Sequence, residues 1–123
     1  MKEEIKKIAE SIESLVSGVD RSKQAVNTEG LPYKIVRGEN SGVFAGFVKE
    51  RNGREVRLFN ARRLWYWDGA ASLSQLAEDG VSKPQNCKFP TAVSEILILD
   101  AIEVLSVTEK AKKTIDEVKI WNA

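Results

Sequence analysis

The sequence predicts an α+β fold, in which an antiparallel β-sheet is combined with an N-terminal amphipathic helix, a short middle helix and a C-terminal helix. Apolar and polar residues alternate with a period of two through most of residues 33–67. At both ends of the chain, the apolar spacing changes to the three and four residues of a helix face. With 123 residues, 42% of them hydrophobic and 30% charged, the chain is large enough for one domain with a real core.

The first segment is predicted to be an amphipathic helix. Its apolar residues follow alternating steps of three and four, at Ile5, Ile8, Ile12, Leu15 and Val19. Two heptads are short for an independent coiled coil, so we expect this helix to pack on the domain or on a second subunit. Interspersed glutamates argue against a signal peptide, and no apolar run has the length of a membrane span. Gly30 and Pro32 then separate a helical extension, residues 1–28, from a single α+β domain, residues 32–123.

Four successive strands are predicted after this break, in the segments PYKIVRG, SGVFAGFVKE, REVRLFN and ARRLWYW. Charge indicates the turn between the second and the third strand. A three-residue loop with Gly53 left-handed pairs Glu50 with Arg54, whereas a two-residue Asn-Gly loop would set like charges opposite each other. We therefore expect the three-residue loop, which places Phe47 opposite Arg57 and so puts a guanidinium among aromatic rings.

Two helices and two more strand segments complete the predicted domain. Asp68 is the expected N-cap of the middle helix, which Gly80 ends. The segment SEILILDAIEVLSV alternates strongly and predicts a pair of strand segments. A C-terminal helix starts at Thr108, because the apolar residues of TEKAKKTIDEVKIW fall on one face, and we expect it to close the core.

Charge balance and the absence of histidine exclude many functions. The net charge of +1 provides no broad field for a long nucleic acid, so an anionic ligand must be small and held locally. A chain without histidine has no Ser-His or Cys-His pair and almost none of the usual zinc sites. We expect the lone Cys87 to be an unreactive residue that packs in the core. The acidic residues show no spacing that would direct two carboxylates to one metal ion; they are Asp68, Glu95, Asp100 and Glu103. The sequence therefore predicts no catalytic residue, metal or cofactor.

Residues 60–77, NARRLWYWDGAASLSQLA, are predicted to be a binding surface. Arginine forks bind phosphate oxygens in pairs, aromatic faces stack on bases, and N–H groups at a helix start bind anions. The candidate ligand-binding residues are Arg63, Trp65, Trp67 and Ser72, together with Arg57 on the preceding strand. Each has a structural alternative, because paired tryptophans are more often core, an arginine stem can cover rings, and an aspartate cap would occupy the N–H groups.

Two further segments carry candidate residues. The loop KPQNCKFP presents Asn86, Lys88 and Phe89, and it could hold an adenine by stacking on Phe89 and hydrogen bonding to Asn86. Three lysines, at 110, 112 and 113, gather near the start of the C-terminal helix and suggest a second anion site, with a solvated lysine face as the alternative.

Three segments together, RRLWYWDGAASLSQLA, the NCKF loop and the TEKA helix start, resemble the first Thoeris anti-defence family, phage proteins that disarm Thoeris immunity by sequestering a signalling nucleotide. The resemblance covers about residues 33–118 and does not include the N-terminal helix. It implies a non-enzymatic sponge for cyclic ADP-ribose isomers, such as glycocyclic ADP-ribose, which TIR-domain enzymes make. It also implies homodimers or higher homo-oligomers with sites between subunits, and in some members binding of cyclic di- or trinucleotides.

Applied position by position, the resemblance implies that Asn86 and Phe89 contact the base. It also implies that residues 65–72 form the wall of the ligand site or the contact between subunits. The residues that it assigns to the phosphates are Arg57, Arg63 and Lys88. If cyclic oligonucleotides also bind, the second pocket comprises Arg57, Thr108, Lys110, Lys112 and Lys113. The implied location is the cytoplasm of an infected bacterial host, which the single cysteine and the lack of a membrane span fit.

Two other function classes stay open from the sequence. A metal-dependent phosphodiesterase would need clustered carboxylates and would convert a cyclic nucleotide instead of retaining it. A protein-binding module would use the surface from Trp65 to Trp67 and the amphipathic ends for partners, without binding any nucleotide.

Overall fold

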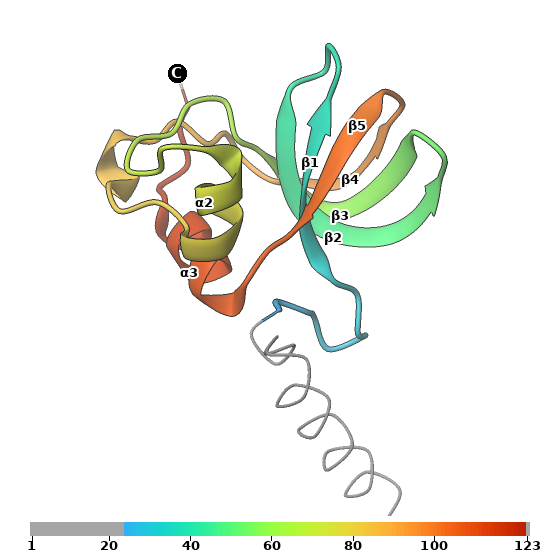
Figure 1. The fold of residues 1–123 in the computed structure, drawn as a ribbon, viewed down its shortest axis with the longest axis horizontal. Coiled ribbons are helices and arrows are strands. Elements are labelled where there is room, and N and C mark those ends of the chain that lie inside the picture. Colours follow the sequence, from blue (N-terminus) through green and yellow to red (C-terminus); the bar gives the residue numbers. More distant parts are fainter. Residues whose placement is uncertain (1–23, 123) are drawn as a thin grey trace, which may run out of the picture.

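The computed structural model describes residues 24–122, which form an antiparallel sheet with two α-helices on one side of it (Figure 1). The elements in chain order are β1 (Tyr33–Gly38), β2 (Val43–Asn52), β3 (Glu55–Arg63), α2 (Leu73–Asp79), the 3₁₀ helix η2 (Pro84–Asn86), β4 (Val93–Ile98), β5 (Ala101–Ser106) and α3 (Glu109–Glu117). The predicted α+β class is confirmed for this part of the chain. No helix within it is long and apolar enough to cross a membrane.

The predicted N-terminal helix falls on residues 1–23, which lie outside the described residues, and it does not extend to residue 28. Gln24 instead forms an antiparallel bridge with Thr108, and Val26 forms one with Pro32. Ala25 between them is fully buried in the core. The chain therefore enters the domain as an extended segment beside the start of α3.

The five strands form one sheet in the order β4-β3-β2-β1-β5. The predicted pair of strand segments in residues 94–107 is present as β4 and β5, but the two do not pair with each other. They lie at opposite edges of the sheet, although only Leu99 and Asp100 join them. The sheet must therefore curl until its two edges meet at this two-residue link.

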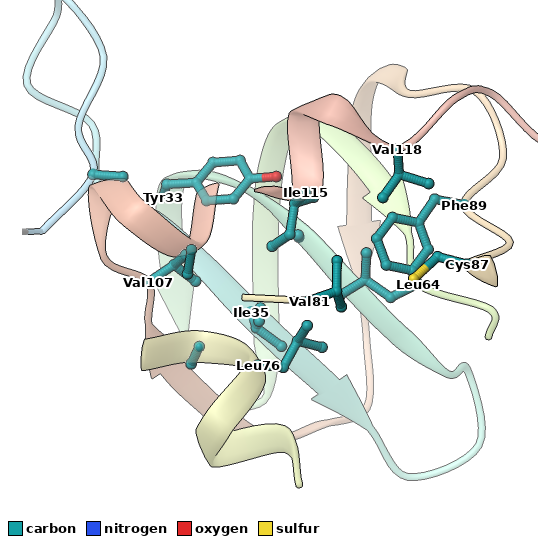
Figure 2. Close-up of a cluster of buried hydrophobic side chains, with 14 residues drawn as sticks. Tyr33, Ile35, Leu64, Leu76, Val81, Cys87, Phe89, Val107, Ile115 and Val118 are labelled. Carbon is teal, nitrogen blue, oxygen red and sulfur yellow. The ribbon is translucent and has the colours of Figure 1, made fainter. Parts of the chain in front are cut away.

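The curled sheet separates two hydrophobic clusters. Neighbouring residues of β1 point to opposite faces, so that Ile35 belongs to one cluster and Val36 to the other. The inner cluster consists of strand residues only, such as Phe44 and Leu58. The outer cluster fills the space between the sheet, the two helices and the loop that contains Phe89 (Figure 2). As expected from the sequence, the C-terminal helix closes this outer core.

The β2–β3 hairpin differs from the predicted one. Asn52 pairs with Glu55, so the loop contains two residues, and the left-handed Gly53 (φ 61°) is the first of them. Glu50 lies opposite Arg57, and a register shift between Glu50 and Val48 brings Phe47 opposite Phe59. The predicted three-residue loop is therefore wrong, and the two-residue loop avoids like-charge pairs by setting Glu50 and Arg57 in a 2.9 Å ion pair.

The segments REVRLFN and ARRLWYW were expected to be two strands, but residues 55–63 form the single strand β3. Asn60 adopts a positive φ of 51° where the β2–β3 register shifts, which is the geometry of a β-bulge. The strand ends at Arg63, so Trp65, Tyr66 and Trp67 lie beyond it. These three aromatic residues are therefore not held in the sheet.

The middle helix α2 begins later than predicted. Its N-cap is Ser72, whose hydroxyl accepts a hydrogen bond from the Gln75 N–H, so Asp68 does not cap it. Gly80 ends the helix, as expected, with its N–H donating to the Leu76 carbonyl.

The side chain of Arg62 links the sheet to the end of α3 and to the loop around Phe89. It is buried, and it donates to four backbone carbonyls: those of Pro90 (3.1 Å), Phe89 (3.0 Å), Ile115 (2.9 Å) and Val118 (2.6 Å). The last two belong to the end of α3, where the helix dipole is negative, and the Ile115 carbonyl also accepts from the Val118 N–H at 3.2 Å. Burial lowers the pKa of Arg62, but a guanidinium still remains charged.

We predict that Arg62→Met, which keeps the apolar stem, lowers the free energy of unfolding by about 3 kcal/mol or more, because it leaves buried carbonyls without donors. Arg63→Met is the matched control, since the exposed Arg63 donates to one carbonyl, that of Ser41, and should cost about 1 kcal/mol or less. Urea unfolding of both variants measures the difference. Equal losses would show that the buried network does not stabilise the fold.

A second prediction concerns the contact between Gly80 and α3. A Cβ at Gly80 would overlap the Thr114 hydroxyl and lie 3.0 Å from the Ala111 Cα, whereas one at Gly30 would meet no atom within 4 Å. Both glycines have a φ of 82°. Gly80→Ala should therefore lower the free energy of unfolding by about 1–3 kcal/mol more than Gly30→Ala, because only the first displaces a packed helix. Thermal and urea unfolding of the pair would contradict this if the two losses matched.

Candidate functional site

An aromatic cluster with one lysine lies on the surface beyond the end of β3. It consists of Trp65, Tyr66, Lys88 and Trp121, which we call the aromatic–lysine patch. The indoles of Trp65 and Trp121 are stacked, with ring centroids 5.1 Å apart and an interplanar angle of 6°. Trp65 is 58% exposed, Tyr66 49% and Trp121 44%. Large aromatic side chains normally leave water on folding, so this much exposed ring area marks a candidate binding surface.

Backbone hydrogen bonds hold the three segments of the patch side by side. Tyr66 and Lys88 exchange two of them, at 2.7 and 3.3 Å, as in an antiparallel bridge. Phe89 and Ile120 form a parallel bridge, and the Trp121 N–H donates to the Phe89 carbonyl over 3.0 Å. The Phe89 carbonyl also accepts from Arg62. The patch is therefore fixed to the core through the backbone on either side of its exposed side chains.

Lys88 lies over the aromatic rings without a carboxylate beside it. Its Nζ is 5.4 Å from the ring centroid of Trp65, 5.8 Å from that of Tyr66 and 5.7 Å from that of Trp121. These distances are within the range of cation–π attraction. Within residues 24–122, no ion pair joins Lys88 to an acidic residue. The ammonium is thus available to an anion that approaches the rings.

The remaining residues of the predicted base site lie apart from this surface. Phe89 is fully buried in the outer core, so its ring has no free face for a base (Figure 2). Asn86 donates one N–H of its amide to the Asp68 carboxylate over 3.0 Å. Ser72 caps α2, and Trp67 is half-buried against the outer core. Only Trp65 and Lys88, of the residues proposed around the NCKF loop and the tryptophan run, are brought together.

The two arginines proposed for phosphates are engaged elsewhere. Arg57 bridges Glu95 (2.6 Å) and Glu50 (2.9 Å), and hydrogen bonds, first to Glu95 and then to Glu50, raise the pKa of its guanidinium. The expected position of Arg57 opposite Phe47 is wrong, because the hairpin register differs. Arg63 donates to the Ser41 carbonyl and lies 4.4 Å from the ring centroid of Phe44.

Most of the residues suggested as a second anion site already have other hydrogen-bond or ion-pair partners. Thr108 caps α3 by accepting from the Ala111 N–H, and its hydroxyl donates to the Glu78 carbonyl. Lys112 pairs with Asp116 at 2.6 Å, and Lys110 pairs with Asp79 at 3.5 Å. A shallow hollow of about 500 Å³ along α3 includes Lys113, but it is also lined by Glu109, Asp116 and Glu117. Its mixed charge is that of a solvated helix face.

Cysteine and the acidic residues offer no reactive centre in the part of the chain that the structure describes. Cys87 is buried in the outer core, and burial raises the pKa of its thiol. No group of three or more cysteine, aspartate or glutamate side chains within residues 24–122 is placed to hold a metal ion.

One member of the patch, Trp121, was not predicted from the sequence, and Tyr66 was included only as part of the wall or subunit contact at residues 65–72. Trp121 follows the C-terminal helix, where no periodicity links it to a strand or a helix face. The composition did contain a signal, because three tryptophans in 123 residues exceed what one small core readily buries. Their positions in the sequence could not show that the first and the third would stack.

We predict that Trp121→Ala abolishes the exciton couplet that two stacked indoles produce in far-UV circular dichroism. The free energy of unfolding should fall by only about 0.5–1.5 kcal/mol, the range for an aromatic pair, because both rings are exposed. Trp67→Phe serves as the control and should retain the couplet, since Trp67 is not in the stack. A couplet that survives in Trp121→Ala would show that the indoles are not stacked in solution.

Comparison with known proteins places the domain in a family without assigning its function. Neither the curated proteins nor the solved structures gave a significant match. Residues 31–115 match a family model that is described as a domain of unknown function, DUF6948. This range contains all five strands and both helices except the last two residues of α3. The chain therefore belongs to the DUF6948 family.

Proposed function

We propose that this protein binds and sequesters a small cyclic nucleotide without cleaving it, in the cytoplasm of an infected bacterium. The ligand is a cyclic ADP-ribose isomer of the kind that TIR-domain Thoeris enzymes make, and sequestration denies it to the effector. The sequence resemblance to the first Thoeris anti-defence family supplies this identity. The aromatic–lysine patch is the observation that supports it best, because it offers stacking faces and, at the same place, a cation that forms no ion pair within residues 24–122.

The patch suits a nucleotide in both of its chemical parts. A base has two apolar faces, and base–aromatic stacking contributes about 1–3 kcal/mol. A phosphate carries negative charge, which Lys88 can meet beside the rings without first breaking an ion pair. Phe89 and Arg57 are not part of this proposal, because the first is buried and the second is bound by two glutamates.

Tight retention of a ligand requires a site that encloses it on more than one side. Small-molecule sites commonly bury 70–90% of a ligand, and affinity rises when the donors are set in advance. The patch is an exposed surface in a single chain. The proposal therefore includes a second subunit as the other wall, in a homodimer or a larger homo-oligomer, which agrees with what the resemblance implies.

A protein-binding module is the second candidate. The observation that favours it is the exposure of Trp65 together with Ile120, which is 57% exposed. Exposed tryptophans are enriched among residues that dominate protein–protein binding. In this alternative the patch receives a partner chain and no nucleotide binds.

The test is to incubate the purified protein with the product of an active Thoeris TIR enzyme, filter the mixture, and heat the retained protein. Both fractions are analysed by mass spectrometry and by effector activation. We expect the signal to be missing from the filtrate and to return intact on heating, because sequestration leaves the ligand unchanged. Bovine serum albumin at equal concentration is the control for non-specific retention.

Each other outcome contradicts the proposal in a different way. A signal that is destroyed would indicate an enzyme, such as the phosphodiesterase considered above. A signal that stays in the filtrate would remove the assignment and favour the protein-binding module. Thermal unfolding gives an independent measure, because a ligand at 100 times its dissociation constant stabilises the folded state by about 2.7 kcal/mol.

A further inference from the structure

Trp121 lies outside the residues that link this chain to other proteins. The family match ends at residue 115, and the resemblance to the anti-defence proteins ends at about residue 118. Yet the Trp121 N–H is bound to the Phe89 carbonyl, and the Trp121 indole stacks on Trp65. The segment after α3 therefore adds an aromatic face that lies outside the matched residues.

We infer that Trp121 is a ligand-stacking residue, and that residues 119–122 complete a site for a phosphate-bearing nucleotide whose base stacks on the indole pair and whose phosphate meets Lys88. This inference rests on the proposed function and names the contacts of its site.

The geometry of the indole pair favours a flat ligand. In a parallel stack, each indole uses one face for its partner, and the other face points outward. Trp65 and Trp121 remain 58% and 44% exposed although they are stacked. A base can therefore extend the stack by covering an outer face, which removes apolar area from water at both rings.

The charge at the patch favours a base that carries phosphate. Lys88 Nζ lies at similar distances from the rings of Trp65 and Trp121, 5.4 and 5.7 Å, so it is beside any base that stacks there. Lys110 and Lys112, in contrast, are already in ion pairs with Asp79 and Asp116. Lys88 is thus complementary to a phosphate close to the stacked base, and a base without phosphate leaves this charge unused.

The backbone explains why such a site would be formed before the ligand arrives. The Phe89 carbonyl accepts from both Trp121 and Arg62, and Arg62 also holds the Val118 carbonyl. Arg62 therefore fixes the segments on both sides of the indole stack. A site with a preset backbone loses less entropy when its ligand binds.

The experiment compares two patch variants with two matched controls. Trp121→Ala is paired with Ile102→Ala, which is similarly exposed (47%) but lies on β5, and Lys88→Gln is paired with Lys49→Gln, which removes an equal charge from β2. The exposed Lys49 belongs to no candidate site. Isothermal titration calorimetry measures binding of three probes: ADP-ribose, adenosine and ribose 5-phosphate. Circular dichroism and thermal unfolding verify that each variant is folded.

We expect the parent protein to bind ADP-ribose at least tenfold more tightly than adenosine or ribose 5-phosphate. Trp121→Ala should weaken ADP-ribose binding roughly 5- to 150-fold, the equivalent of one stacked base. Lys88→Gln should also weaken it and should reduce its salt dependence, because a phosphate contact is lost. The controls Ile102→Ala and Lys49→Gln should bind as the parent does.

Equal binding by the patch variants and their controls would overturn the inference, and so would an absence of ADP-ribose binding by the parent. Retention of the TIR-enzyme product separates this result from the proposed function. If the parent and Trp121→Ala retain that product equally, sequestration stands and the stacking role is wrong. If the parent protein does not retain that product, but binds ADP-ribose more tightly than Trp121→Ala does, the stacking role stands and the proposed function is wrong.

Discussion

The buried guanidinium of Arg62 is the interaction on which the outer layer of the domain depends. It comes from the sheet and donates to carbonyls at the end of α3 and in the loop around Phe89, so three parts of the chain meet at one side chain. Its acceptors are neutral carbonyls instead of a carboxylate. A charge buried in this way is costly unless its donors are satisfied, and here four carbonyls accept from them, of which those of Phe89 and Ile115 also accept from a backbone N–H. The same contacts that satisfy the arginine therefore fix the loop and the helix.

The candidate site follows from this arrangement. Lys88 precedes the Phe89 and Pro90 carbonyls that Arg62 holds, and Trp121 follows the Val118 carbonyl. The patch thus consists of exposed side chains whose neighbouring backbone carbonyls are held by the Arg62 side chain. A surface with exposed rings and a rigid base is suited to recognition of a flat ligand, because few degrees of freedom remain to be fixed on binding. The curled sheet contributes by providing an inner cluster of its own, which leaves its outer face for the helices.

Local patterns in the sequence were most informative where the structure is itself local. The period of two identified the strand segments, and Gly80 and Thr108 marked the end of α2 and the start of α3. The middle of the chain was harder. Asp68 precedes the helix as a cap would, but Ser72 has that role, since the chain stays irregular for three more residues. Charge pairing chose the wrong hairpin loop, because the two-residue loop after Asn52 also sets opposite charges, Glu50 and Arg57, across from each other.

The sequence by itself determined the α+β class of the described domain, the positions of most of its elements and the run of arginines and aromatic residues at 62–67. These properties depend on spacing and composition along the chain. Only the tertiary structure decided which aromatics are available: Phe89, predicted to stack on a base, became core, and Trp121, which no pattern indicated, became surface. It also decided that Arg62 is buried while Arg63 is exposed, and that β4 and β5 lie at opposite edges of the sheet. Such outcomes depend on contacts between residues far apart in the sequence, and a local pattern cannot specify those contacts.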